Sequence, residues 1–533
     1  MELLIPLHGI GGRGDLPVPL WLAIYSAGAA VAVSFFALAA FWSRPRFEAT
    51  AGKSLELLTR IVDNRLTRAV LKLAGLAALG LMLGAAWFGS TSPALNPAPT
   101  WLYVWIWVGI IPLSLLCGPI WRLANPFRTI AGLLRRTPYR KPPKDRELPR
   151  GRVLRGQVNL SSGRELTTGR ALPGDAELRG DAELPVEAEL PGEVELPRGR
   201  ELTTGRALPG DAGSRGEAEL LGDAELTEGR ELSAYRKLPE GIAYWPAVAG
   251  LAGFLWLELA YPDGSAPIVV ATFVTGYAVV NVVAGIVYGP AWFRIGDSFE
   301  VYAEVLARLS PLGRGPDGRL VLRNPLAGLA TMPQEPGIVG LLCLLLGSTA
   351  FDGISRWSAW MQLTGELSRT QHIVVHTLGL AAAVAIVSVL FVLAAQTTGA
   401  AQVRPGAVGR GGLPGAFVHS LVPIAIGYAV AHYFSFAMFQ GQEGVLLATD
   451  PFGRGWDLLG TNGMRIDYAF LSTAVIAGVQ IGAIVLGHVL GVVSAHDRAA
   501  ELFRRRQLRR AQYPMLAAMV AFTAGGIALV TAS

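Results

Sequence analysis

The chain has 533 residues, of which 51% are hydrophobic and 16% are charged, and its mean hydropathy is +0.40. This composition is too apolar for a water-soluble protein of this length and predicts an integral membrane protein. The net charge of +6 comes from basic residues between apolar blocks, which favours membrane orientation over nucleic-acid binding. The two cysteines, Cys117 and Cys343, lie in apolar segments and offer neither a disulfide framework nor a Cys-x-x-Cys site.

Apolar segments long enough to cross a bilayer recur along most of the chain. A helical span needs about 20 mostly apolar residues. Ten segments fit, at 20–42, 70–89, 101–121, 242–261, 268–290, 337–354, 372–397, 415–439, 468–493 and 514–531. The sequence therefore predicts an all-α fold, a polytopic transmembrane helix bundle of about ten spans embedded in a lipid bilayer.

The basic residues of the short loops predict how these spans are oriented. The loop after the first span carries Arg and Lys residues between 44 and 68, whereas the next loop, 90–100, carries no charge. The alternation continues to an arginine cluster at 498–510. Because basic loops stay in the cytoplasm, we expect a multi-pass protein of the inner (plasma) membrane with both termini outside.

A block of different composition separates the third and fourth spans. Residues 144–239 repeat a six-residue unit such as Gly-Asp-Ala-Glu-Leu-Arg, and the string 164–176 recurs unchanged at 200–212. A left-handed β-helix would need more β-branched residues, so the pattern favours a disordered, low-complexity cytoplasmic loop that is dispensable. The chain is then organised as a first membrane region over 1–143, the hexad-repeat loop over 144–239 and a second membrane region over 240–533.

Two further segments are predicted to be surface helices. Segment 297–309 begins with Asp297 and Glu300 at capping-box spacing and should lie on the cytoplasmic side. Segment 353–371 should be an amphipathic piece on the outer side. The Gly-rich string 9–14 fits a dinucleotide-binding pattern but follows no strand, so we interpret it as an outer loop.

The histidines are the candidate functional residues. Ionisable groups inside spans are energetically costly, so their presence usually indicates a function. There are seven histidines. His372 and His376 are one helical turn apart and could share a metal, and His432 should lie at a similar depth near the outer end of its span. Asp352 and Glu366 fall at the same level as candidate bridging ligand or general base. The pattern predicts an outward-facing site for a divalent metal such as zinc, unless these are interface histidines bonded to loop backbone.

The remaining histidines lie nearer the other membrane surface. His419 and His488 should be neighbours at the inner ends of two spans, and His496 with Asp497 should stand at the inner water boundary, where a role at a helix C-terminus is favoured.

Three strings resemble a poorly characterised family of bacterial membrane proteins commonly labelled fenitrothion hydrolase. They are His8–Trp21, His419–Ser435 and Gly487–Arg498. The resemblance covers the membrane portion but not the hexad block. It implies hydrolysis of an organophosphorus ester, and no established active-site motif comes with it.

Three hypotheses follow. The first is a metal-dependent phosphotriester hydrolase acting on an apolar small molecule, with His372, His376 and His432 as ligands and Asp352 or Glu366 as base. The second is a membrane transporter or channel whose histidines line a path, and the third is a non-catalytic membrane scaffold. Histidines that converge within about 5 Å favour the first hypothesis, whereas histidines spaced along the helices favour the second.

Overall fold

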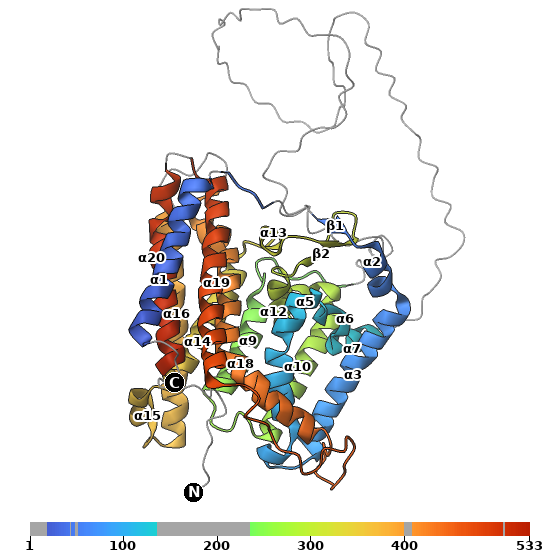
Figure 1. Cartoon of the computed structure of the whole chain (residues 1–533). Helices are drawn as coiled ribbons and strands as arrows, with labels where there is room; N and C mark the ends of the chain where they lie inside the picture. The colour runs from blue at the N-terminus through green and yellow to red at the C-terminus, as the bar shows by residue number, and fades with distance from the viewer. Residues whose placement is uncertain are drawn as a thin grey trace, which may run out of the picture. The chain divides into compact units, whose positions relative to one another are not determined.

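The computed structural model describes residues 19–42, 44–47, 52–135, 235–398, 408–504 and 507–532 (Figure 1). Almost all of the predicted hexad-repeat loop, 144–239, lies outside these residues. The Gly-rich string 9–14 and His8 also lie outside them.

Within the described residues, nine helical segments are long and apolar enough to cross a bilayer. They are α1 (Leu20–Phe41), α3 (Arg65–Phe88), Pro97–Cys117 (α4, Pro97–Thr100; the π-helix η3, Trp101–Val108; α5, Ile110–Cys117), α10 (Pro267–Tyr288), α14 (Pro336–Ser355), α16 (Arg369–Thr398), Leu413–Leu447 (α17, Leu413–Phe417; η7, Val418–Ser420; α18, Leu421–Leu447), α19 (Thr473–Leu502) and Ala511–Leu529 within α20 (Leu508–Ala532). The predicted all-α, multi-pass bundle is confirmed at this level.

The predicted span 242–261 is shorter than expected. Its helix, α9, covers Trp245–Leu259, or 15 residues. At 1.5 Å per residue α9 is about 22 Å long, against about 30 Å for a hydrocarbon core. Pro246 lies in its first turn and Pro262 follows its end, so the helix is confined between two prolines.

Short elements connect the long helices. They are α2 (Glu56–Asp63), η2 (Pro93–Leu95), α6 (Trp121–Ala124), α7 (Pro126–Leu134), α11 (Pro290–Ile295), α12 (Ser298–Ala307), α13 (Pro325–Leu329), α15 (Ser358–Thr364), η6 (Arg410–Gly412), β1 (Lys53–Ser54), β2 (Leu312–Arg314) and β3 (Leu320–Leu322). The strands form a small antiparallel sheet of order β1-β3-β2, which the sequence did not predict. We call the end of the bundle that carries this sheet the sheet side.

An ion-pair network holds the sheet side together. Asp63 at the end of α2 receives hydrogen bonds from Arg68 on α3, at 2.7 Å, and from Arg314 on β2, at 2.7 and 3.1 Å. The Arg314 guanidinium lowers the pKa of Asp63 below its usual value. The basic segment between α1 and α3 is thereby fixed to the sheet.

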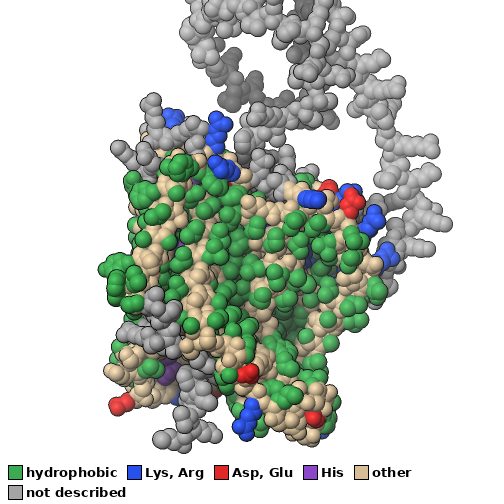
Figure 2. Space-filling model, in the orientation of Figure 1, with side chains coloured by type: hydrophobic (Ala, Val, Ile, Leu, Met, Phe, Trp, Pro, Cys, Tyr) green, Lys and Arg blue, Asp and Glu red, His purple; other side chains and the backbone are tan. Residues whose placement is uncertain are grey.

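The lateral surface of the bundle is apolar. Hydrophobic side chains cover the face seen in Figure 2, whereas the charged side chains lie near its two ends. Phe36 on α1, Leu73 on α3 and Ile386 on α16 are each more than half exposed. An exposed apolar band between charged ends is what a lipid bilayer covers in a membrane protein.

The bundle has two groups of helices joined by α18. Helices α1, α16, α19 and α20 pack together, and α3, α7 and α10 pack together elsewhere (Figure 1). Helix α18 packs along α19 and also against η3. A side chain added to Gly487 of α19 would come within 2.6 Å of the Pro423 carbonyl oxygen, so a glycine is required where α18 and α19 cross.

Helix α12 is buried, which corrects the prediction of a surface helix at 297–309. Asp297 caps α12 as predicted and accepts hydrogen bonds from the backbone of Phe299 and Glu300. Nevertheless, nine of its ten residues are buried. The amphipathic pattern was misleading because its polar side, Glu300, faces Arg128 of α7 inside the protein rather than water.

Asn125 connects α7 and α12. Its side-chain oxygen caps α7 by accepting from the backbone of Phe127 and Arg128, and its amide donates to Asp297 at 2.7 Å and to Glu300 at 2.8 Å. Burial raises the pKa of Glu300 to about 7. The two carboxylates therefore depend on the Asn125 amide for hydrogen bonds that water does not supply.

We expect Asn125→Ala to lower the free energy of unfolding by at least about 2 kcal/mol, since it removes a helix cap and two hydrogen bonds to buried carboxylates. Asn324→Ala is the matched control, because Asn324 caps α13 through one bond to Leu326. It should cost about 1 kcal/mol. Denaturant unfolding in detergent measures both, and equal losses would contradict the role given to Asn125.

Candidate functional site

A cluster of charged residues is buried where α14 meets α18. Asp352 lies in the last turn of α14, Arg356 is the residue that follows this helix, and His432 lies in the middle of α18. Asp352 and His432 are 5% and 7% exposed. The Asp352 Oδ2 atom contacts His432 Nε2, while Arg356 Nη2 lies 2.9 Å from Asp352 Oδ1 and 3.1 Å from His432 Nε2.

This arrangement places one proton between two groups that can each carry it. A carboxylate oxygen and an unprotonated imidazole nitrogen are both acceptors, so a hydrogen bond between Asp352 and His432 requires a proton on one of them. With the proton on His432, Asp352 is a carboxylate paired with Arg356. With the proton on Asp352, the carboxyl group donates to the lone pair of His432 Nε2, which the Arg356 guanidinium, always a donor, also faces.

A second carboxylate lies beside this pair. Glu258, in the last turn of α9, accepts a hydrogen bond from the Tyr433 hydroxyl at 3.4 Å through Oε1, and its Oε2 is buried without a hydrogen-bond partner. Its charge interacts with those of Asp352 and Arg356. The site therefore combines two carboxylates, a guanidinium and an imidazole, drawn from α9, α14 and α18.

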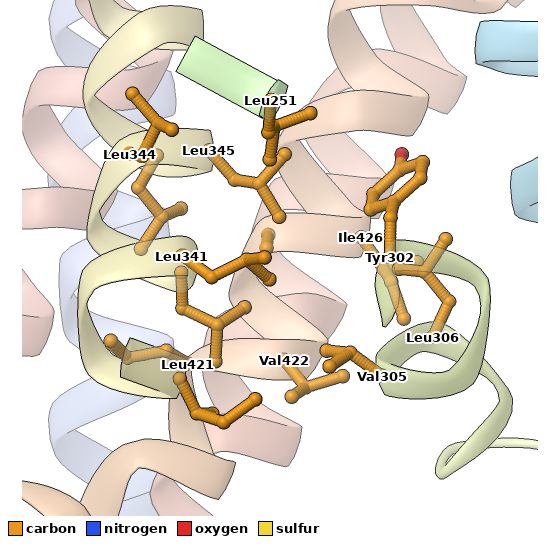
Figure 3. Close-up of a cluster of buried hydrophobic side chains, with 14 of the residues drawn as sticks. Leu251, Tyr302, Val305, Leu306, Leu341, Leu344, Leu345, Leu421, Val422 and Ile426 are labelled. Carbon is orange, nitrogen blue, oxygen red and sulfur yellow. The ribbon is translucent and has the colours of Figure 1, made fainter. Parts of the chain in front are cut away.

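The helices that carry the charged residues also contribute to a group of packed apolar side chains (Figure 3). Leu251, Leu345 and Ile426 belong to it and precede Glu258, Asp352 and His432 by seven, seven and six residues. At 1.5 Å per residue the layer is about 10 Å from the charges on all three helices, which therefore run in the same direction. The rest of the layer is contributed by Tyr302, Val305, Leu306, Leu341, Leu344, Leu421 and Val422. We call these labelled side chains the apolar layer.

His372 and His376 form a separate pair on α16. Their rings stack with centroids 3.9 Å apart. His376 Nε2 accepts a hydrogen bond from the Trp360 indole at 3.3 Å, and the other nitrogen, Nδ1, faces the Leu259 carbonyl oxygen at 3.2 Å. An indole N–H only donates and a carbonyl only accepts, so His376 is neutral and has no lone pair left for a metal.

The described residues do not assemble the predicted three-histidine metal site. They contain no group of three or more His, Cys, Asp or Glu side chains that could hold a metal ion. His432 faces Asp352 and Arg356, and Glu366 is exposed in the turn between α15 and α16. His432 and His376 do lie at a similar level, since His432 contacts Asp352 and His376 packs against the preceding residue, Phe351, but the two rings bond to different partners.

Asp352 is the one predicted carboxylate that enters the cluster. Sequence reasoning missed the partner Arg356, although its i, i+4 spacing from Asp352 is a signal that the sequence carries. It also gave Glu258 no assigned role. Segment 353–371 does contain a short helix with exposed residues, α15, in agreement with the prediction.

Three further buried histidines, His419, His488 and His496, lie along α19 or face it. His488 Nδ1 donates to the Ile484 carbonyl at 2.8 Å, and its ring lies edge-on to Tyr428 with centroids 5.4 Å apart. His419 faces the Ser494 carbonyl oxygen at 3.3 Å, rather than His488. His496 faces the Gln512 side-chain oxygen at 3.0 Å and the Trp42 carbonyl oxygen at 2.8 Å.

Asp497 follows His496 and helps to hold the chain after α1. Its carboxylate accepts from the Trp42 indole at 3.0 Å and from the Arg46 backbone at 2.7 Å. His496 and Asp497 lie in the last two turns of α19. Near the C-terminus of α19, these two residues thus have a structural role: they hydrogen-bond to the segment that follows α1.

No protein-family model matches this chain, and neither a curated protein nor a solved structure was found to be similar to it.

We expect Asp352→Ala to lower the free energy of unfolding by about 3 kcal/mol, because it removes the buried carboxylate that pairs with Arg356. The double variant Asp352→Ala/Arg356→Ala should be more stable than Asp352→Ala alone, since the Arg356 charge that lost this carboxylate is removed with it. Denaturant titration in detergent measures the two variants side by side.

Asp263→Ala is the control for this comparison, because Asp263 and Arg369 form an exposed ion pair. Asp263→Ala should lower the free energy of unfolding by less than about 1 kcal/mol. A double variant less stable than Asp352→Ala would show that the stranded charge is not the source of the instability.

Proposed function

We propose that this chain is a membrane transport protein that moves protons across the bilayer, with the Asp352–His432 pair as its proton-binding site. The observation that carries the proposal is the shared proton position between two titratable groups, contacted by Arg356 and buried among apolar helices.

Charged side chains are costly inside a membrane. Moving an isolated ion into a medium of low dielectric constant is strongly unfavourable, and even a paired charge gains little stability there. A hydrophobic contact between α14 and α18 would serve packing at least as well. Ionisable residues within spans are therefore usually retained for a function, and proton relays and ion paths are typical examples.

The other histidines support transport over a compact metal centre. His488 and His419 are buried at different positions along the contact with α19, His432 faces α14, and each of the three bonds to a different partner. Polar groups spaced along the helices in this way are what a transport path requires.

The orientation belongs to the proposal as well. The basic segment between α1 and α3 includes β1 and so belongs to the sheet side, whereas the connection between α3 and α4 is uncharged. Following the preference of basic loops for the cytoplasm, we place the sheet side inside the cell and both termini outside, in the plasma membrane. The charged cluster then lies toward the outer side of the apolar layer.

A second candidate is the hydrolase implied by the family resemblance. A carboxylate that orients an imidazole is the arrangement of a general base, so the Asp352–His432 pair is also suited to activating water. Turnover of a chromogenic phosphotriester by the purified protein, lost in Asp352→Asn, would favour this candidate.

The transport proposal predicts proton uptake by proteoliposomes that contain the purified chain and an internal pH dye. A potassium gradient with valinomycin supplies the driving potential. Asp352→Asn should reduce the initial rate at least about tenfold, because an amide cannot exchange a proton with His432. Asp263→Asn, at an exposed position, should match the unaltered protein, and uptake no faster than in protein-free vesicles would refute the proposal.

The proposed orientation places the C-terminus outside the cell. A reporter fused after Ser533 should therefore be active only if it functions outside the cytoplasm. Alkaline phosphatase, which needs an oxidising compartment for its disulfides, should be active, and a fluorescent protein that matures only in the cytoplasm should be dark. The reverse pattern would invert the assigned topology.

A further inference from the structure

We propose that His488 is a second proton-binding site, which accepts the proton that leaves the Asp352–His432 pair and passes it on along the α18–α19 contact. This inference rests on the proposed transport function and names the route that the proton takes.

The hydrogen bonding of His488 fixes where its lone pair lies. Nδ1 is 2.8 Å from the Ile484 carbonyl oxygen, and because a carbonyl only accepts, Nδ1 carries the hydrogen. Nε2 then has a free lone pair, and it is buried without a hydrogen-bond partner in a residue that is 0% exposed. A buried acceptor without a hydrogen-bond partner is destabilising, so its presence calls for an explanation beyond packing.

Tyr428 lies one helical turn before His432 on α18 and packs against the His488 ring. Tyr428 and His432 are four residues apart on α18, so their side chains project from the same face. The Tyr428 ring lies edge-on to the His488 ring, and its hydroxyl donates to the Phe522 carbonyl of α20. The titratable groups follow one another as the Asp352–His432 pair, Tyr428 and His488.

The surroundings of His488 are otherwise apolar. Tyr428 is the titratable group that faces it from α18, and Ile484 is its partner on α19. The cluster that contains Ile484 and Tyr428 is completed from α1 and α20 by small or aliphatic side chains such as Ala27 and Ile527. A proton on His488 would therefore not be held there by a neighbouring carboxylate, which suits a transient carrier.

The apolar layer makes the alternative route less suitable. On the faces of α18 that meet α9, α12 and α14, Val422 and Ile426 pack into that layer, whose members offer no titratable group except Tyr302 (Figure 3). The α18–α19 contact carries His488 and then His419. A proton that crosses toward the sheet side thus meets nitrogen bases along α19.

The proton transfer balances without any redox partner. As the bond between the proton and Asp352 or His432 breaks, a new bond forms between the proton and the lone pair of His488 Nε2. His488 becomes an imidazolium until the proton leaves toward the sheet side, and the ring then returns to its neutral form.

The test uses His488→Gln in the full chain, reconstituted in the proteoliposomes described above. We expect the initial rate of potential-driven proton uptake to fall at least about tenfold, because Gln cannot pass a proton on as imidazole does. The matched control is Thr523→Val, which alters a fully buried polar residue whose hydroxyl bonds within its own helix to Met519.

The outcomes separate the two proposals. No uptake by the unaltered protein overturns the proposed function and this inference together. Uptake by the unaltered protein that His488→Gln leaves unchanged overturns this inference alone.

A spectroscopic measurement covers the case in which His488→Gln does not fold. In ¹⁵N-histidine, ¹³C-isoleucine-labelled protein, the ring in contact with the Ile484 carbonyl should show a protonated Nδ1 and an unprotonated Nε2 at neutral pH. A ring whose Nε2 carries the proton would overturn the proposal, because it would leave no lone pair to receive one.

Discussion

The contact of Asp352 with His432 sets how three helices must meet. For these residues to share a proton while Arg356 touches both, the last turn of α14 must face the middle of α18. Glu258 on α9 approaches the same charges, so α9 is fixed at the same level. A shift of one helix by a single turn, about 5.4 Å, would leave buried charges unpaired, at a cost larger than most packing contacts recover.

The apolar layer and the α18–α19 contact surround this cluster and are packed in different ways. Leu251, Leu345 and Ile426 fill the space about two turns away on the three helices and exclude water from that side. The crossing of α18 and α19 depends instead on Gly427 and Gly487, which let two backbones approach. Close approach brings His488 against Tyr428, so a packing feature and a chain of titratable groups occupy the same contact.

Sequence reasoning predicted the membrane architecture well, because span length and hydropathy are local properties. It was less successful where tertiary contacts decide. The polar face of α12 points to Arg128 of α7 rather than to water, and no pattern within 297–309 could indicate that. His432 and His376 lie at a similar level of α14, against Asp352 and Phe351, but no sequence pattern could show that the two rings bond to different partners. The i, i+4 spacing of Asp352 and Arg356 is visible in the sequence, but their contact with His432 on another helix is not.

The central claim is that Asp352 and His432 share one exchangeable proton inside the bundle. Infrared difference spectroscopy of the protein in lipid, recorded during a pH titration and compared with Asp352→Asn, tests it most directly. The claim predicts a carboxylic-acid C=O band that belongs to Asp352 and that changes together with a band of the His432 ring. An Asp352 carboxylate that stays ionised throughout, beside a His432 ring that keeps its proton throughout, would contradict it.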